Sequence, residues 1–121
     1  MARDRIIPRP YAQPAGIPFA TSEEAWFWFI QANEAKAAGA RVSAGLALVQ
    51  RPCEPVDLLR VVDRLYRQRA LIRDHLHVLA HYGRRSSAPD PRCRREERAC
   101  TLWREAFARI DPVLRDKGIV Q

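Results

Sequence analysis

The chain has 121 residues, the length of one domain, of which 47% are hydrophobic and 29% are charged. This balance is typical of a globular protein and excludes a wholly disordered chain. Lysine and arginine outnumber aspartate and glutamate by 21 to 14, which gives a formal net charge of +7 and favours an anionic partner. No stretch approaches the roughly 18 consecutive apolar residues of a membrane span.

The first residues are rich in proline, which predicts a flexible basic arm over 1–18 ahead of a single helical domain over 19–121. Prolines interrupt every apolar stretch of this arm, whereas a signal peptide needs an unbroken run of about 7–15 apolar residues. We therefore expect no export signal and a cytoplasmic location. Cys53, Cys93 and Cys100 form no C-x-x-C pair, so neither a disulfide framework nor a zinc site is expected.

Thr21 and Glu24 are spaced as a capping box, which predicts the start of the first helix, and Gly39 predicts its end. Four consecutive aromatic residues followed by Ile30 form the Trp26–Ile30 block of this helix. Because a helix turns about 100° per residue, these side chains cannot all face one side. The block indicates either a central core helix, which is favoured, or an exposed aromatic surface for protein docking.

The segment after this helix holds a short apolar run, Leu46–Val49, that fits either a short strand or an extended packed segment. The second helix is predicted from Pro55 to Arg67, because proline suits a first helical turn. Apolar residues at helical spacing form its predicted buried stripe, which consists of Leu58, Val61, Val62, Leu65 and Tyr66.

The third helix is predicted over about residues 70–82, either separate or as a kinked continuation of the second, with Gly83 as its stop. Its predicted inward face consists of Ile72, Leu76, Leu79 and either Tyr82 or Gly83. His75 borders this apolar face, which favours a structural role for its ring.

A polar basic loop over 84–91 precedes the fourth helix, which is predicted over about residues 92–110. Asp90, followed by a proline, suits the N-cap position of this helix. Pro112 is expected to break or kink the helix, with Asp111 capping a last turn. Together the elements predict an all-α, compact bundle of about four helices.

No pattern in the chain is typical of a catalytic site. The serines lie in no G-x-S-x-G turn, and the isolated glycines form no phosphate-binding loop. His77 and His81 are four residues apart on a predicted helix and could share a metal, but the sequence offers no third ligand. We therefore expect a protein that is not an enzyme and that needs no metal or cofactor.

Arginine supplies 19 of the 21 basic side chains. Its guanidinium group can make bidentate hydrogen bonds with phosphate and with guanine. Two predicted helices carry basic residues at helical spacing, and a dense arginine cluster follows them. The candidate nucleic-acid-binding residues are Arg60, Arg64, Arg67, Arg73, His77, His81, Arg84, Arg85, Arg92, Arg94, Arg95 and Arg98. The second and third helices, joined by a tight turn, would form a helix-turn-helix-like pair. The alternative is a solvated basic face whose arginines pair with nearby carboxylates.

The run Val62-Asp63-Arg64-Leu65, followed by Arg69 and by Val78-Leu79-Ala80-His81-Tyr82-Gly83, resembles part of a known family. It is similar to the start of the helix-turn-helix region in sigma-factor region 4 and phage antiterminators. The resemblance covers about residues 58–83 and implies DNA binding. In that family these elements precede the DNA-reading helices, whereas here a proline-rich loop and one long helix follow. No base-reading residue is carried over from the family.

The sequence therefore predicts a small non-catalytic DNA-binding protein, of the transcriptional-regulator type, with RNA as the other nucleic acid it could take. Its phosphate contacts would come from the arginine-rich loop and the start of the fourth helix. The alternative is a protein-interaction adaptor. It would dock through the Trp26–Ile30 block or onto an acidic partner, for example on RNA polymerase.

Overall fold

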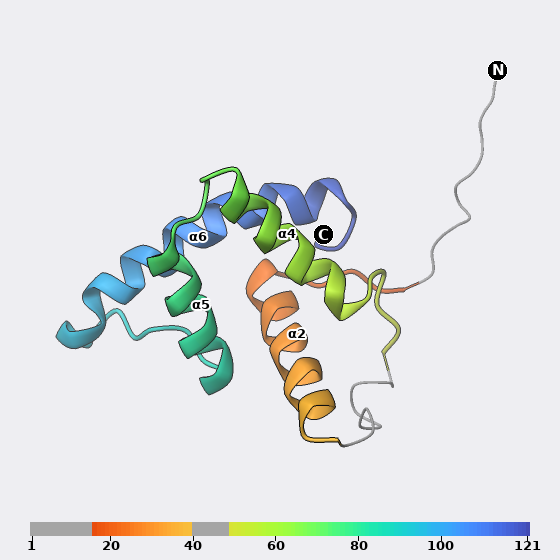
Figure 1. Cartoon of the computed structure of the whole chain (residues 1–121), viewed down its shortest axis with the longest axis horizontal. Helices are drawn as coiled ribbons and strands as arrows, with labels where there is room; N and C mark the ends of the chain where they lie inside the picture. Colours follow the sequence, from red (N-terminus) through yellow and green to blue (C-terminus); the bar gives the residue numbers. More distant parts are fainter. Residues whose placement is uncertain (1–15, 40–48) are drawn as a thin grey trace.

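The computed structural model of the chain describes residues 16–39 and 49–121, and these parts form an all-α bundle (Figure 1). Its elements are α2 (Ser22–Ala37), α4 (Pro55–Arg67), α5 (Arg73–Arg85), the 3-10 turn η1 (Arg94–Glu96) and α6 (Glu97–Asp116). Four helices confirm the fold expected from the sequence. Most of the predicted basic arm and most of the Leu46–Val49 run lie outside the described residues.

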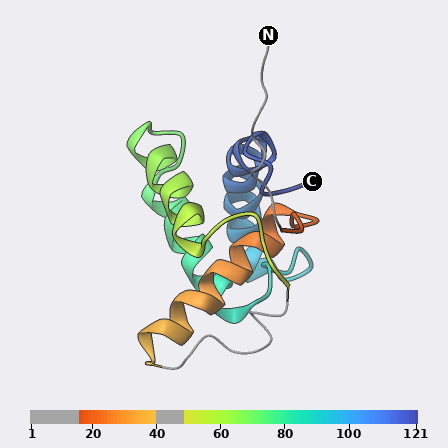
Figure 2. The same ribbon diagram turned by 90° about the vertical axis from the view of Figure 1, so that its right-hand side faces the viewer.

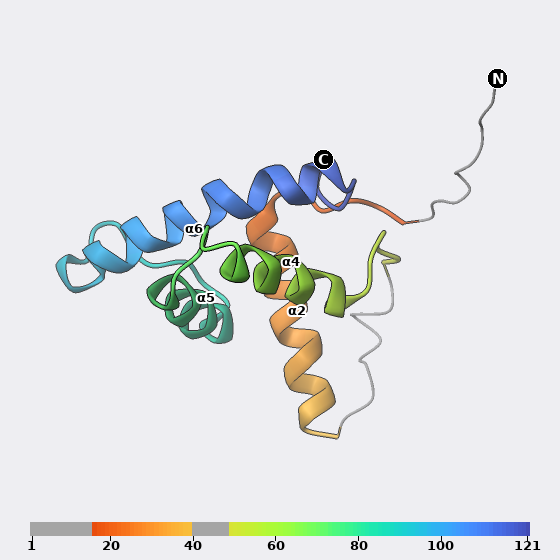
Figure 3. The same cartoon turned by 45° about the horizontal axis from the view of Figure 1, so that its top comes forward.

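The long helix α6 organises the bundle. Helices α2, α4 and α5 all pack against it, and α2 also packs against α4 and α5. Helices α4 and α5 follow one another along α6 (Figure 3) and share few close contacts with each other. Turned by 90°, the bundle shows α2 passing diagonally across the other helices (Figure 2). The position of α5 is therefore set by α2 and α6.

The first described helix begins and ends where local signals place it. The Thr21 hydroxyl accepts a 3.1 Å hydrogen bond from the backbone N–H of Glu24. The Glu24 carboxylate in turn accepts from the backbone N–H of Ala20 at 2.8 Å, one residue earlier than in a standard capping box. Gly39 follows the helix with a φ of +76°, which glycine adopts without strain.

The Trp26–Ile30 block faces the core, as favoured from the sequence. Trp26, Phe29 and Ile30 are buried, and the indole of Trp26 donates a 2.9 Å hydrogen bond to the Leu79 carbonyl. The other two aromatic residues of the block are half-buried. Phe27 stacks on the Trp103 ring at 5.9 Å, and Trp28 meets the Phe19 ring at 5.1 Å between centroids. All four aromatic residues of the block therefore make ring contacts within the fold.

Helix α4 has the predicted bounds, and Leu58, Val61, Val62 and Leu65 are buried as expected. The prediction that Tyr66 completes this stripe is wrong, because its side chain is 39% exposed. Tyr66 lies about 100° further round the helix than Leu65, which puts it past the edge of the packed face.

Helix α5 is separate from α4 and begins three residues later than predicted, at Arg73. Arg69 in the connection has a φ of +65°, which ends the preceding helical path. Ile72 was expected to face inward, but it precedes the helix as its N-cap and is 51% exposed. The Nδ1 atom of His75 accepts a 3.0 Å hydrogen bond from the Ile72 N–H and caps the start of α5.

The expectation that Gly83 stops this helix is also wrong. Gly83 is buried inside α5, which continues for two further residues. A Cβ atom at this position would lie 2.9 Å from both Ile30 Cγ1 and Trp26 Nε1. Glycine is therefore needed for the close approach of α5 to α2 and does not end the helix.

Helix α6 starts later and runs further than predicted. Asp90 accepts a 2.9 Å hydrogen bond from the Arg92 N–H, so it caps a turn ahead of η1 rather than the helix itself. The helix also continues through Pro112. Proline has no N–H to donate to the preceding turn, but this residue is exposed, so water can bond to the carbonyl that is left without a backbone donor. Asp111 caps no new turn; it accepts hydrogen bonds from Ser22 Oγ at 2.6 Å and Arg115 Nε at 2.7 Å.

The two ends of the described domain meet in an isolated parallel bridge between Phe19 and Val120. The Phe19 N–H donates to the Ile119 carbonyl at 2.9 Å, and the Gln121 N–H donates to the Phe19 carbonyl at 3.0 Å. Phe19 is fully buried, so this contact closes the core beside the end of α6. None of the helices in the described ranges combines the length and apolar character needed to cross a membrane.

Candidate functional site

The candidate site begins with the outward face of α5. Arg73, His77, His81 and Arg84 are all exposed and share one side of the helix, as their spacing predicted. The opposite side carries buried residues, among them Leu79. The exposed line from Arg73 to Arg84 spans eleven helical steps, or about 16 Å at 1.5 Å per residue.

The arginine cluster lies on the last turn of α5, the following loop, η1 and the first turn of α6, and the loop joins two helix ends that lie apart in Figure 1. We call this cluster the basic end. Its members are Arg84, Arg85, Arg92, Arg94, Arg95 and Arg98, all of which are exposed. Over residues 84–98 these six arginines face three carboxylates, which leaves a net charge of +3.

Glu96 and Tyr82 hold the basic end in shape. The Glu96 carboxylate accepts a 3.0 Å hydrogen bond from the Asp90 N–H, which ties the loop to η1. This bond is the main cause that lowers the pKa of Glu96, with further lowering by the Tyr82 hydroxyl. Arg85 lies over the Tyr82 ring at 5.0 Å from its centroid. The loop is therefore tied to η1, which carries Arg94 and Arg95 exposed on its surface.

Three arginines of the basic end form ion pairs. Arg84 pairs with Glu34 at 3.8 Å, Arg92 with Asp90 at 3.6 Å, and Arg98 with Asp74 at 3.2 Å. Exposed pairs of this kind contribute only about 0–1 kcal/mol, so a phosphate can compete for the guanidinium.

The other three arginines of the basic end, Arg85, Arg94 and Arg95, form no ion pair with any residue of 16–39 or 49–121, and the same is true of Arg73 on α5.

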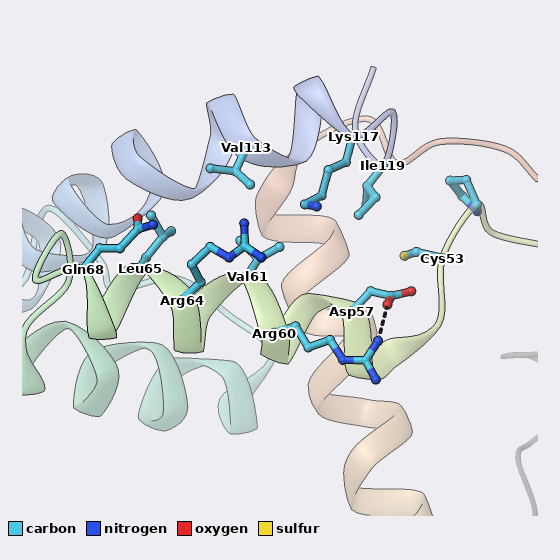
Figure 4. A pocket seen from close by; sticks show the side chains of 11 residues that line it. Cys53, Asp57, Arg60, Val61, Arg64, Leu65, Gln68, Val113, Lys117 and Ile119 are labelled. Carbon is cyan, nitrogen blue, oxygen red and sulfur yellow. Dashed lines mark hydrogen bonds and ion pairs between the residues drawn. The ribbon is translucent and has the colours of Figure 1, made fainter.

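The α4 arginines lie elsewhere. Arg60 pairs with Asp57 at 3.4 Å and Arg67 with Asp63 at 3.1 Å. Arg64 lies beside Lys117, just beyond the last turn of α6 (Figure 4), whereas Arg98 of the basic end lies on the first turn of that helix. A 20-residue helix is about 30 Å long, so Arg64 lies far from Arg98 and the candidate residues do not all gather at the basic end.

A hollow of about 660 Å³ lies where α4 meets the end of α6 (Figure 4). Its apolar lining includes Val61, Leu65, Val113 and Ile119, and its cations are Arg60, Arg64 and Lys117. Burial raises the pKa of the Cys53 thiol to about 11, with a smaller contribution from Asp57, so this lining residue is neutral at pH 7. Sequence reasoning missed the hollow, because no local pattern links Lys117 to α4.

The histidines separate into one structural and two exposed residues. Because His75 Nδ1 accepts from a backbone N–H, its proton lies on Nε2, which donates to Glu105 Oε1 at 3.0 Å. This bond lowers the pKa of Glu105. His77 and His81 are exposed on α5. In the described part of the chain, no three His, Cys, Asp or Glu side chains are arranged to hold a metal ion.

Comparisons of the chain with protein-family models, with curated proteins and with solved structures found no match. Its function is therefore inferred from the charges and shape of the described residues.

Proposed function

We propose that the protein is a small, non-catalytic DNA-binding protein of the transcriptional-regulator type, acting in the cytoplasm. In this proposal α5 lies in the major groove with Arg73, His77 and His81 toward the base edges. The basic end then contacts the flanking phosphates. The major groove, about 12 Å wide, admits one α-helix, and α5 presents a face free of large apolar side chains.

One observation carries this proposal: α5 has an exposed cationic face that ends at Arg84, and the first turn of α6, with Arg98, lies beside the start of the same helix through the Arg98–Asp74 pair. A helix face without flanking cations would have no means of holding the DNA backbone. Conversely, an arginine cluster without a protruding helix would bind any polyanion equally well. The combination supplies both phosphate contacts, which give affinity, and a helix able to reach base edges, which gives specificity.

The packing of α5 supports the same role. Its inward side is held by α6 and by α2, where the Trp26 indole bonds to the Leu79 carbonyl. The short connection over 68–72 leaves α4 beside the first turn of α5 without covering its outward face. The proposal therefore assigns DNA contacts to α5 and the basic end, and none to Arg60, Arg64 or Arg67.

The aromatic surface that the protein-adaptor alternative could use is reduced, because Trp26, Phe29 and Ile30 are buried and only Phe27 and Trp28 are half-buried. The better supported form of that alternative is an acidic protein partner, such as RNA polymerase, for the basic end. Both partners would be attracted by charge, so the test has to separate a helical polyphosphate from an acidic polypeptide.

The test is a fluorescence-anisotropy titration of a labelled 30-base-pair duplex at increasing salt, repeated with duplex RNA and with poly-glutamate as competitors. The proposal predicts binding that weakens steeply with salt, because each neutralised phosphate releases counterions. DNA should displace the labelled duplex at lower concentration than poly-glutamate of equal charge. Absence of binding at low salt, or preferential displacement by poly-glutamate, rejects the proposal.

A further inference from the structure

The hollow between α4 and the end of α6 lies outside the proposed DNA-binding surface and has the properties of a second binding site. Its volume of about 660 Å³ is within the range of small-molecule pockets, which is about 300–1,000 Å³. Its apolar lining comes from two helices and the segment after α6, through Val61, Val113 and Ile119. Because Val61 and Ile119 are buried core residues and Val113 is half-buried, the apolar area open to a ligand is small and favours a slender apolar ligand body.

The charges around the hollow are unbalanced. Arg60 is paired with Asp57, but Arg64 and Lys117 form no ion pair with the residues that the structure describes. Figure 4 shows the Arg64 guanidinium and the Lys117 ammonium reaching from α4 and from the end of α6 toward the same space. Two like charges that converge over an apolar surface repel each other, and one anion between them would relieve that repulsion.

We propose that this hollow binds a small amphipathic anion, with one carboxylate or phosphate head and an apolar body. The head would lie between Arg64, which can donate two parallel hydrogen bonds, and Lys117. The body would lie against the half-buried Val113, where the buried Val61 and Leu65 form the floor of the hollow. The neutral thiol of Cys53 adds no repulsion to such a ligand at the mouth of the hollow.

Charge separates this ligand from the other candidate occupants. The chain's own first residues carry Arg3, Arg5 and Arg9, so the two cations of the hollow would repel them. A nucleic acid would satisfy the cations but would leave the apolar lining uncovered. A neutral lipid would cover the lining but would leave Arg64 and Lys117 unpaired. Only a ligand that is both anionic and apolar matches both halves of the site.

The test uses decanoate below its micelle-forming concentration as the probe, with decan-1-ol as the uncharged analogue of equal length. Alkylation of the three cysteines by a maleimide is followed by mass spectrometry. Cys53 lines the hollow, whereas Cys93 and Cys100 lie near the basic end and act as internal controls. Decanoate should slow the alkylation of Cys53 about fivefold or more and leave the other two rates unchanged, whereas decan-1-ol should protect Cys53 less.

Isothermal titration with variants locates the anionic head. Loss of two charge-assisted contacts in Arg64→Gln/Lys117→Gln should weaken decanoate binding about tenfold or more. The matched double variant Arg94→Gln/Arg95→Gln, which removes as much charge from the basic end, should bind decanoate like wild type. Equal protection of all three cysteines, equal protection by decan-1-ol, or equal weakening by both double variants would overturn the proposal. None of these results depends on DNA binding.

Discussion

The indole nitrogen of Trp26 and the carbonyl of Leu79, 53 residues apart in the chain, are joined by a buried 2.9 Å hydrogen bond. The bond lies one helical turn from Gly83, where α5 closely approaches Trp26 and Ile30 of α2. Together the two contacts set the rotation of α5, and therefore which of its side chains face outward. The proposed DNA-binding face depends on this interface between α2 and α5.

Replacing Gly83 by alanine should destabilise the protein, although alanine is the better helix former by about 1 kcal/mol. The new methyl group would lie 2.9 Å from Ile30 Cγ1 and from Trp26 Nε1, and overpacking of a core costs about 1–3 kcal/mol. Urea denaturation followed by circular dichroism measures the loss. The double variant Ile30→Ala/Gly83→Ala should lose less free energy of unfolding than the sum of the losses in the two single variants. Full additivity would show that the close approach is not the cause.

The pH dependence of stability should report the hydrogen bond between Ser22 and Asp111. The pKa of Asp111 is lowered first by the Ser22 hydroxyl and then by Arg115. A lowered carboxyl pKa in the folded state stabilises the fold above the ordinary value of about 4, and this contribution is lost as the pH falls through the lowered pKa. Ser22→Ala should therefore destabilise the protein at pH 7 and have a smaller effect near pH 3.

The control for this prediction is Ser87→Ala, which removes an exposed hydroxyl elsewhere in the chain. Its effect on the free energy of unfolding should be close to zero at both pH values. A Ser22→Ala loss that stays constant from pH 7 to about pH 3 would contradict the assignment of the pKa shift.

Removal of the His75 ring should loosen the start of α5. In His75→Ala the Ile72 N–H loses its cap and Glu105 loses its hydrogen-bond donor, at a cost of about 1 kcal/mol or more. Hydrogen exchange measures this locally: the Ile72 amide should exchange faster, while amides in the middle of α6 should not change beyond the global loss. His77→Ala, which alters an exposed residue of the same helix, should leave the Ile72 amide protected. Equal Ile72 exchange in both variants would count against the cap.

The sequence predicts helix ends well where the signal is local. Thr21, Gly39 and Pro55 act through their own backbone neighbours, so their roles can be recognised without the fold. Gly83 could not be interpreted in this way, because its neighbours Trp26 and Ile30 come from another helix. A glycine that ends a helix and a glycine that admits a neighbouring helix look the same in one sequence.

The candidate site shows the same difference between features that local sequence predicts and features that depend on how the helices pack. Helical spacing correctly placed Arg73, His77, His81 and Arg84 on one exposed face, because that face depends only on the local helix. The pairing of basic-end arginines with acids of α2 and α5 depends on how helices pack. The hollow with Lys117 depends on where α6 ends, and that end lies past a proline expected to break the helix.

The central claim is that phosphates are held at the basic end and not along α4. Its most direct test is the slope of log affinity against log salt for a DNA duplex, measured for wild type and two double variants. Arg94→Gln/Arg95→Gln should bind more weakly and lower the slope by about 1.8, because each lost phosphate contact removes about 0.9. Arg60→Gln/Arg64→Gln, with the same change in net charge, should keep most of the wild-type slope. Equal slopes for the two variants, or a larger reduction in the α4 variant, would contradict the account.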